Sequence, residues 1–225
     1  MTKLVSWLKA ARLRTLPLSV SGVLVGTALA NYYGSNNHLI FMLALLTTVG
    51  FQVTSNFAND YGDGVKGIDN MDRIGPKRAL QSGLLSKLEL KRGIVLSVLI
   101  NIVLVIALVY AAFGFQNLFY MALFLILGAA SIWAAIKYTI GKTAYGYKGL
   151  GDVFVFLFFG LLAVLGSLFL YTKSLTALSV LPAITIGLLS VGVLNLNNLR
   201  DYESDKKAGK NTLIVNMGFY NGKIY

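Results

Sequence analysis

The sequence predicts an all-α protein, a polytopic bundle of membrane-spanning helices, and three observations lead to this prediction. The 225 residues are 56% hydrophobic and only 13% charged, whereas a soluble domain carries about 25% charged residues. Apolar stretches of about 20 residues, the length that crosses a bilayer as a helix, recur along the chain. Basic residues gather in alternate connecting segments, as they do in membrane proteins. We expect a single domain over residues 1–225.

The predicted elements follow in order along the chain. Residues 3–14 mix apolar and basic side chains, so we expect a short interfacial helix that anchors the N-terminus. Polar residues such as Gln52 in the second span and Asn195 in the sixth indicate that these spans face other helices or a cavity. Ser86 and Glu89 fit a capping box that opens the third span. The six predicted spans cover residues 15–33, 38–60, 90–113, 118–138, 150–171 and 176–199.

The distribution of charge predicts the orientation of these spans. If the N-terminus is cytoplasmic, 19 of the 20 Lys and Arg residues and all nine acids lie on the cytoplasmic side, and only Lys173 lies outside. This asymmetry and attraction to anionic lipid explain most of the net charge of +11. Because the chain has no Cys, disulfide and thiol chemistry are excluded. The first apolar segment is too long for a cleavable signal.

Two clusters of acids and amides close the second and sixth spans. In a helix the first cluster would place four side chains on one stripe: Asn56, Asn59, Asp60 and Asp63. The second cluster repeats this spacing with Asn198, Asp201 and Asp205. Carboxylates at the end of a membrane helix are expensive to keep there, so they indicate function. Oxygen ligands without Cys, and with a single His in the chain, suit Mg²⁺, which binds carboxylates together with substrate phosphates.

These clusters predict chemistry on a lipid diphosphate. Facing carboxylates could hold Mg²⁺ ions that neutralise diphosphate as it departs. Basic residues of the inner loops could grip the same oxygens: Arg73, Lys77, Arg78 and Lys142. An apolar cavity between the helices would accept the hydrocarbon tail, and the lipid group would pass to an acceptor. For Asp69, inside the loop, a solvated carboxylate is an equally good interpretation.

Other classes of protein remain as alternatives. A transporter would suit polar residues within spans, although here the acids gather at one membrane face. A phospholipid-pathway alcohol phosphotransferase is also rich in carboxylates, but its Asp-Gly-x-x-Ala-Arg signature is absent. A structural membrane subunit could pair its acids with neighbouring Arg and Lys. No nucleic-acid partner is expected.

Three ordered motifs resemble those of the UbiA superfamily of intramembrane prenyltransferases. The segment from Asn59 to Asp63, with Lys66-Gly-Ile-Asp69 behind it, resembles the first signature. The segment from Asn198 to Asp205, followed by Gly209-Lys-Asn-Thr-Leu, resembles the second, and Tyr138-Thr-Ile-Gly-Lys142 matches the middle loop. The resemblance covers essentially the whole chain. Its details are most similar to the branch that acts on 1,4-dihydroxy-2-naphthoate in menaquinone synthesis.

The resemblance implies roles for particular residues. In the usual first signature the last Asp falls where Gly67 stands here, with Asp69 two residues later. Asp152 would either orient the aromatic acceptor or cap the fifth helix. The implied ligands of Mg²⁺ are Asn59, Asp63, Asp201 and Asp205, joined by Asp60 and Asp69. The residues implied to hold the diphosphate are Arg73, Arg78 and Lys142, with Tyr138 beside it. The implied catalytic set is Asp63, Asp201, Lys142 and Tyr138.

The function implied by the resemblance is a Mg²⁺-dependent transfer of a polyprenyl group. The donor would be a polyprenyl diphosphate and the acceptor 1,4-dihydroxy-2-naphthoate, with loss of CO₂ and diphosphate to give demethylmenaquinol. Another aromatic acceptor, such as 4-hydroxybenzoate, is the alternative. The protein would lie in the plasma (inner) membrane among its lipids, with the N-terminus and active-site loops cytoplasmic. Family members have nine spans and six are found here, so we expect an incomplete C-terminus and weak or absent turnover by this chain alone.

Overall fold

The computed structural model describes residues 2–69 and 74–225, and within them it contains helices and no strands. Six helical segments are long and apolar enough to cross a membrane, which confirms the predicted polytopic helical bundle. The spanning helices are α2 (Leu16–Tyr32), α3 (His38–Val65), α4 (Lys87–Phe113), α5 (Leu118–Lys137), a fifth span (Gly151–Thr172) and α8 (Val180–Arg200). Short helices complete the fold: α1 (Lys3–Ala11), α9 (Tyr202–Lys207), α10 (Leu213–Met217) and α11 (Phe219–Ile224).

The fifth span differs from the others in its backbone. It consists of α6 (Gly151–Val155), a π-helix (Phe156–Gly166) and α7 (Ser167–Thr172), whereas its apolar sequence predicts an ordinary α-helix. π-Helical turns are uncommon and often lie beside functional sites. Hydropathy has the same pattern for both kinds of helix, so the sequence does not distinguish them.

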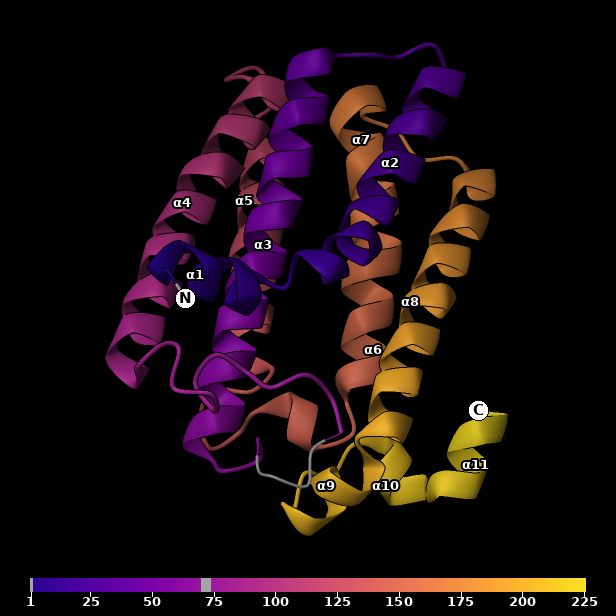
Figure 1. The fold of residues 1–225 in the computed structure, drawn as a ribbon. Coiled ribbons are helices and arrows are strands. Elements are labelled where there is room, and N and C mark those ends of the chain that lie inside the picture. The colour runs from indigo at the N-terminus through magenta and orange to yellow at the C-terminus, as the bar shows by residue number, and fades with distance from the viewer. Residues whose placement is uncertain (1, 70–73) are drawn as a thin grey trace.

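The spans form two groups that join along α2 and α3. Figure 1 shows α3, α4 and α5 together on one side, with α2, the fifth span and α8 on the other. The fifth span packs closely on α8, where a Cβ added to Gly160 would come within 2.5 Å of the Gly187 Cα atom. The ends of α3 and α8 that carry the acid clusters lie at the same end of the bundle, with α9 and α10 beside them (Figure 1). We call this the motif end.

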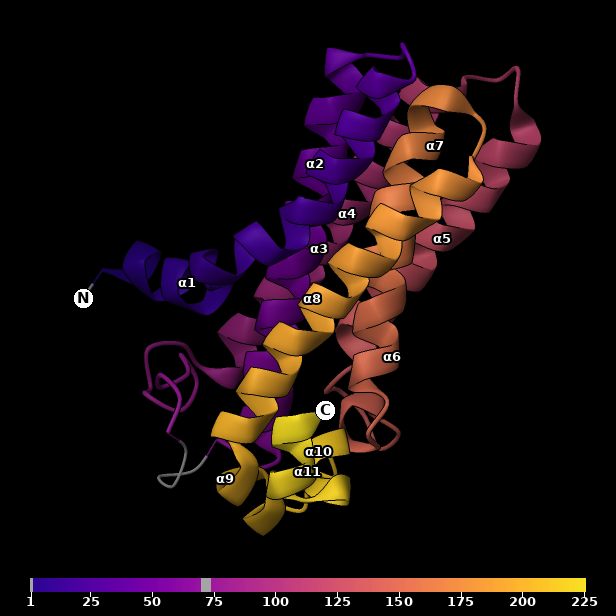
Figure 2. The same ribbon diagram turned by 90° about the vertical axis from the view of Figure 1, so that its right-hand side faces the viewer.

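The predicted N-terminal helix is α1. It lies at a steep angle to the spans and projects from one side of the bundle (Figure 2). Trp7 packs edge-on against Phe57 of α3, with ring centroids 5.2 Å apart. The chain then turns at Arg12, whose φ of 52° lies in the left-handed region. The Asn56 Nδ2 atom donates to the Ala11 carbonyl oxygen at 2.8 Å, so this buried amide fixes the turn against α3.

The start of α4 confirms the predicted capping box. The Ser86 hydroxyl accepts from the Glu89 backbone N–H, and the Glu89 carboxylate accepts from the Ser86 backbone N–H. These two bonds satisfy donors that the first turn of a helix leaves open. Glu89 also pairs with Lys3, which connects α1 to the start of α4.

Candidate active site

A cavity of about 640 Å³ lies between the spans and has two chemically different parts. At the motif end its walls are charged and polar. Farther from that end the walls are apolar, with Leu108, Phe124, Leu127, Phe158 and Leu162 among the lining residues. A ligand that is anionic at one end and hydrocarbon along the rest would match both parts.

The two acid clusters meet at the polar part of this cavity. Asn59 and Asp63 reach it from α3, and three residues reach it from the end of α8 and from α9: Asn198, Asp201 and Asp205. The Lys210 Nζ atom lies 3.7 Å from the Asp63 Oδ2 atom and 4.0 Å from the Asp205 Oδ1 atom. One ammonium group is therefore within ion-pair distance of a carboxylate from each cluster.

Asp63 is buried, and each of its two carboxylate oxygens has a polar partner. Its Oδ1 atom accepts a hydrogen bond from the Tyr147 hydroxyl at 2.6 Å, while Oδ2 faces Lys210. Burial, together with the Asp63 charge, raises the pKa of Tyr147, so this phenol stays a neutral donor. The Lys66 Nζ atom lies 3.8 Å from the centre of the Tyr147 ring, and it donates to the Thr139 carbonyl oxygen at 2.9 Å. Together these contacts fix the orientation of the Asp63 carboxylate.

The spacing of the second cluster predicted one continuous helix, and this prediction is wrong. α8 ends at Arg200, and Asp201 has φ −93° and ψ 8° before α9 begins. The Arg200 guanidinium donates to both oxygens of Asp201, at 2.9 and 2.7 Å. Despite this break, Asp201 and Asp205 both line the cavity.

Positive charge exceeds negative charge on the described walls of the cavity. Three carboxylates line it, those of Asp63, Asp201 and Asp205. The basic residues that line it number five: Arg12, Arg14, Arg78, Arg200 and Lys210. A site with this balance favours a polyanion such as a diphosphate.

Some predicted site residues lie outside the cavity lining. Asp60 is buried and accepts hydrogen bonds from the backbone N–H groups of Ala79 and Leu80, at 2.9 and 3.2 Å. It therefore holds the loop that carries Arg78. Asp69 is also buried, with its Oδ1 atom 3.6 Å from the Arg78 Nε atom.

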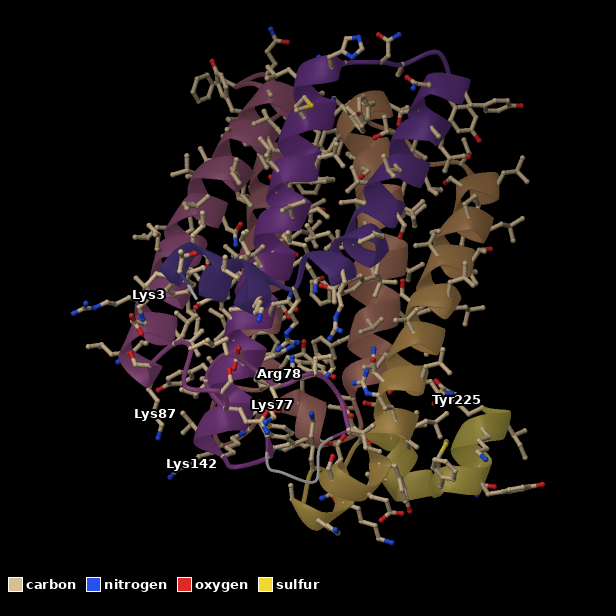
Figure 3. All side chains as sticks on the ribbon, in the orientation of Figure 1. Lys3, Lys77, Arg78, Lys87, Lys142 and Tyr225 are labelled. Atoms are coloured by element: carbon tan, nitrogen blue, oxygen red, sulfur yellow. The ribbon has the colours of Figure 1, made fainter. Side chains whose placement is uncertain are left out.

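One predicted diphosphate ligand, Lys142, does not line the cavity. Figure 3 shows Lys142 at the edge of the molecule, pointing away from the bundle, whereas Arg78 lies nearer its interior. Lys142 is exposed and is not part of the lining. Arg73 lies outside the described residues.

Tyr138 directly follows α5, and Asp152 lies at the start of the fifth span. Tyr138 lines the cavity and packs edge-on against Tyr145, with ring centroids 5.4 Å apart. Burial is the main cause that raises the pKa of Tyr138, followed by the charge of Asp63. Asp152 is buried at the start of the fifth span, and its Oδ1 atom has no hydrogen-bond partner among the described residues.

Sequence reasoning missed four of the five basic residues that line the cavity: Arg12, Arg14, Arg200 and Lys210. Arg12 and Arg14 belong to the segment expected to anchor the N-terminus, and they reach the cavity because the chain turns at Arg12. Lys210 belongs to the Gly209-Lys-Asn-Thr-Leu segment that follows the second cluster, but its position in the sequence alone does not indicate that it faces Asp63. The sequence signal that could have found Lys210 is a basic residue shortly after each acid cluster, Lys66 after the first and Lys210 after the second.

The donor set fits a divalent metal, although the described residues do not form a metal-binding geometry. No group of three or more His, Cys, Asp or Glu side chains converges on one point in the part of the chain that the structure describes. The Lys210 ammonium lies between Asp63 and Asp205, and Arg200 pairs with Asp201. The positive charges of Lys210 and Arg200 therefore offset the buried carboxylates of both clusters.

Comparison with known proteins identifies the family of this chain. The model of the UbiA prenyltransferase family matches residues 19–225. The chain belongs to the UbiA prenyltransferase family. It is therefore a prenyltransferase, and with its six apolar spans it is an integral membrane protein.

Named relatives cover nearly all of the chain. It is 47% identical to the 1,4-dihydroxy-2-naphthoate octaprenyltransferase of Escherichia coli (strain K12), over 98% of this chain and 71% of that protein. A protein of the same name from Haemophilus influenzae is 49% identical over 99% of this chain and 72% of the relative. The UbiA prenyltransferase domain-containing protein 1 of Dictyostelium discoideum is 29% identical over 98% of this chain.

Proposed function

We propose that this prenyltransferase moves a polyprenyl group from a polyprenyl diphosphate to 1,4-dihydroxy-2-naphthoate, and that Mg²⁺ is required. The single observation that carries the proposal is the meeting of Asp63 and Asp205 at Lys210 in a cavity with a polar and an apolar part. The names of the two bacterial relatives support the choice of donor and acceptor.

In this proposal, acids and amides from both clusters hold the metal. Asn59 and Asp63 act from α3, and Asp201 and Asp205 act from the second cluster. A bound Mg²⁺ would supply charge neutralisation for the departing diphosphate. Tyr147 keeps one Asp63 oxygen in place, so the other stays turned toward the second cluster. Asp60 and Asp69 support the loop and Arg78 rather than facing the cavity.

Basic residues at the motif end bind the diphosphate. Arg78, Arg14 and Lys210 line the cavity there and offer charged donors. Arginine can bind two phosphate oxygens at once, which fixes the orientation of the group. The roles of Arg73 and Lys142 stay predictions, and Lys142 would have to turn inward from the 138–150 loop.

In the proposed transfer, departure of the diphosphate leaves a prenyl carbon that the acceptor attacks. The bond between the prenyl C1 atom and its oxygen breaks, and the diphosphate leaves with the electron pair. The electron-rich ring of the acceptor forms a new bond from its carboxylate-bearing carbon to the prenyl carbon. CO₂ then leaves from that carbon, and its bonding electrons restore the aromatic ring. Tyr138, which lines the cavity, and Asp152 at the start of the fifth span would orient the acceptor.

Water has to be excluded, because it would capture the cation-like prenyl carbon. The apolar part of the cavity supports this requirement. Phe154 and Phe158 line it beyond Tyr138, and the Tyr145 ring stacks on Phe154 with centroids 3.9 Å apart.

The proposal is tested with membranes that contain the chain, labelled prenyl diphosphate and either 1,4-dihydroxy-2-naphthoate or 4-hydroxybenzoate. We expect prenylated, decarboxylated product from the naphthoate and none after EDTA, with recovery on adding Mg²⁺. Product from 4-hydroxybenzoate alone would contradict the proposed acceptor, and undiminished product in EDTA would contradict the metal.

A matched pair of variants tests the site. Asp205→Asn removes the charge of a buried cavity carboxylate, so we expect transfer to fall at least about 100-fold. Glu203→Gln makes the same chemical change two residues away on an exposed side chain, and transfer should stay within about twofold. Equal effects of the two substitutions would contradict the assignment of the second cluster.

A further inference from the structure

One face of α3 contacts the loop that joins α5 to the fifth span. Asn59, Gly62 and Lys66 lie at i, i+3 and i+7 along α3 and its C-cap, so they share this face. The loop residue that meets all three is Thr139, which is fully buried. Thr139 directly follows Tyr138, a residue of the cavity lining, so the contact lies beside the candidate active site.

Two features of α3 hold Thr139 in place. A Cβ atom added to Gly62 would come within 2.7 Å of the Thr139 Cβ and Oγ1 atoms, so glycine at this position permits the close approach. The Lys66 Nζ atom donates to the backbone oxygens of Thr139 and Gly141, at 2.9 and 3.1 Å. The position of the Thr139 hydroxyl is therefore fixed by the backbone around it and by the packing on Gly62.

The Thr139 hydroxyl makes two contacts with α3. Its Oγ1 atom lies 2.9 Å from the Ala58 backbone oxygen and 3.2 Å from the Oδ1 atom of Asn59. A hydroxyl has a single hydrogen to donate, and a carbonyl oxygen can only accept. The hydrogen belongs to the shorter contact, with Ala58, because two bare oxygens would otherwise face each other there. At the contact with Asn59, the hydroxyl oxygen is then left as an acceptor.

An acceptor at this place calls for a donor from Asn59. The two ends of an Asn amide are nearly identical in shape, so the hydrogen-bond partners decide which end is oxygen and which is nitrogen. If the amide is turned by about 180°, Nδ2 donates to the Thr139 hydroxyl and both contacts of the hydroxyl are satisfied. The Oδ1 atom then occupies the other end of the amide. Because Asn59 lines the cavity, a ligand there meets this oxygen end.

We propose that Thr139 is a positioning residue that turns the Asn59 carbonyl oxygen toward the cavity, where it can bind a divalent metal. This inference rests on the proposed function, since it assigns an orientation to one of the metal ligands proposed there. A divalent cation binds the oxygen end of an amide, and the NH₂ end would repel it. The same loop would then orient both proposed ligands of α3, Asn59 through Thr139 and Asp63 through Tyr147.

Valine and serine at position 139 separate the hydroxyl from the rest of the side chain. Thr139→Val removes the hydroxyl and keeps the shape, whereas Thr139→Ser keeps the hydroxyl. Thr54→Val is the matched control on α3. Thr54 is also fully buried, and its hydroxyl also contacts an amide, since the Asn101 Nδ2 atom donates to it at 2.8 Å. Thr54 does not line the cavity, so its loss affects stability without affecting the site.

The measurement is Mn²⁺ binding to the purified chain, followed by electron paramagnetic resonance with a non-transferring prenyl thiolodiphosphate bound. Loss of a partner that orients a metal ligand costs roughly 10- to 100-fold in affinity, so Kd for Mn²⁺ should rise at least about tenfold in Thr139→Val. Thr139→Ser and Thr54→Val should stay within about twofold of the wild type. An unchanged Kd in Thr139→Val, or an equal rise in Thr54→Val, would overturn the positioning role.

Asn59→Asp tests whether Thr139 acts through the amide. An Asp side chain has an oxygen at both ends, so its orientation no longer matters. We expect Thr139→Val to change Kd for Mn²⁺ by less than about twofold in the Asn59→Asp background. The same rise in both backgrounds would mean that Thr139 acts through the backbone, and it would overturn the proposal.

Two further outcomes separate this inference from the proposed function. If Thr139→Val weakens binding of the thiolodiphosphate and leaves Mn²⁺ binding unchanged, the NH₂ end of Asn59 faces the cavity and the inference is wrong. If the wild-type chain takes up no Mn²⁺ at all, the proposed metal site fails, and the assignment of Thr139 fails with it.

Discussion

At the scale of single residues, Lys210 connects the two halves of the candidate site. Its ammonium lies between Asp63 and Asp205, which come from segments more than 140 positions apart in the sequence. Bringing two carboxylates together in a partly dry cavity is unfavourable unless a cation lies between them. Lys210 fulfils this requirement, and it faces the same space in which we place the diphosphate.

Lys210→Gln should therefore weaken binding of the prenyl diphosphate. A hydrogen bond to a charged partner contributes about 1.5–3 kcal/mol, so we expect KM for the donor to rise at least about tenfold. Steady-state kinetics at saturating acceptor and Mg²⁺ measure this. Lys87→Gln, an exposed lysine at the start of α4, is the control. A KM that stays at the wild-type value in Lys210→Gln would remove Lys210 from the proposed diphosphate site.

In the proposed site, Tyr147 would act on the metal through Asp63. Tyr147→Phe deletes the hydroxyl that donates to the Asp63 Oδ1 atom and keeps the ring under Lys66. The carboxylate becomes free to rotate, so the Mg²⁺ concentration for half-maximal activity should rise about tenfold. Near-wild-type kcat should return at saturating Mg²⁺. Tyr220→Phe, on an exposed side chain, should leave the Mg²⁺ titration unchanged, and an identical titration in Tyr147→Phe would contradict the positioning role.

Helical spacing at the ends of two apolar spans indicates the two acid clusters, and the family resemblance implies Asn59, Asp63, Asp201 and Asp205 as the ligands within them; these roles stay predictions. The spacing does not separate Asp60 from Asp63. Positions three residues apart on a helix differ in direction by only about 60°, and only the packing decides which of them faces the cavity. Arg12 and Arg14 could not be assigned from spacing, because a single left-handed residue in the N-terminal arm directs them there.

At the scale of the helices, the hydropathy pattern was enough to predict the six spans, and the Ser-x-x-Glu spacing predicted the capping box at the start of α4. It could not predict the π-helix, because Phe156–Gly166 is uniformly apolar and would fit an α-helix equally well. It also does not show which helices pack most closely. That property depends on glycine, and Gly160 and Gly187 bring the fifth span and α8 together.

Two glycines allow a test of this packing with opposite expected signs. A Cβ atom at Gly160 would come within 2.7 Å of the Ala183 backbone oxygen, so Gly160→Ala should destabilise the bundle by about 1–3 kcal/mol. A Cβ atom at Gly192 meets nothing, and Gly192→Ala should stabilise the helix by up to about 1 kcal/mol. Unfolding of both variants in detergent measures the difference. Equal shifts would mean that the fifth span and α8 are not in close contact.

At the scale of the whole molecule, both acid clusters and most of the basic residues lie at one end of the bundle (Figure 1). Negative surface potential and the positive-inside tendency both favour this end on the cytoplasmic side. The opposite end carries short loops with few charges, such as residues 33–37. A cytoplasmic active site would also receive its diphosphate donor from the side on which the charged head group is soluble.

Because the chain has no native Cys, single cysteines can test this orientation directly. Asn36→Cys lies in an exposed loop at the end opposite the acids, and Glu203→Cys is exposed at the motif end. We expect a membrane-impermeant maleimide to label Asn36→Cys in intact cells, or in spheroplasts where an outer barrier is present. Glu203→Cys should react only after permeabilisation, because the bilayer keeps the reagent from that face. The reverse pattern would place the acid clusters outside and would contradict the orientation inferred from charge, whatever the site itself does.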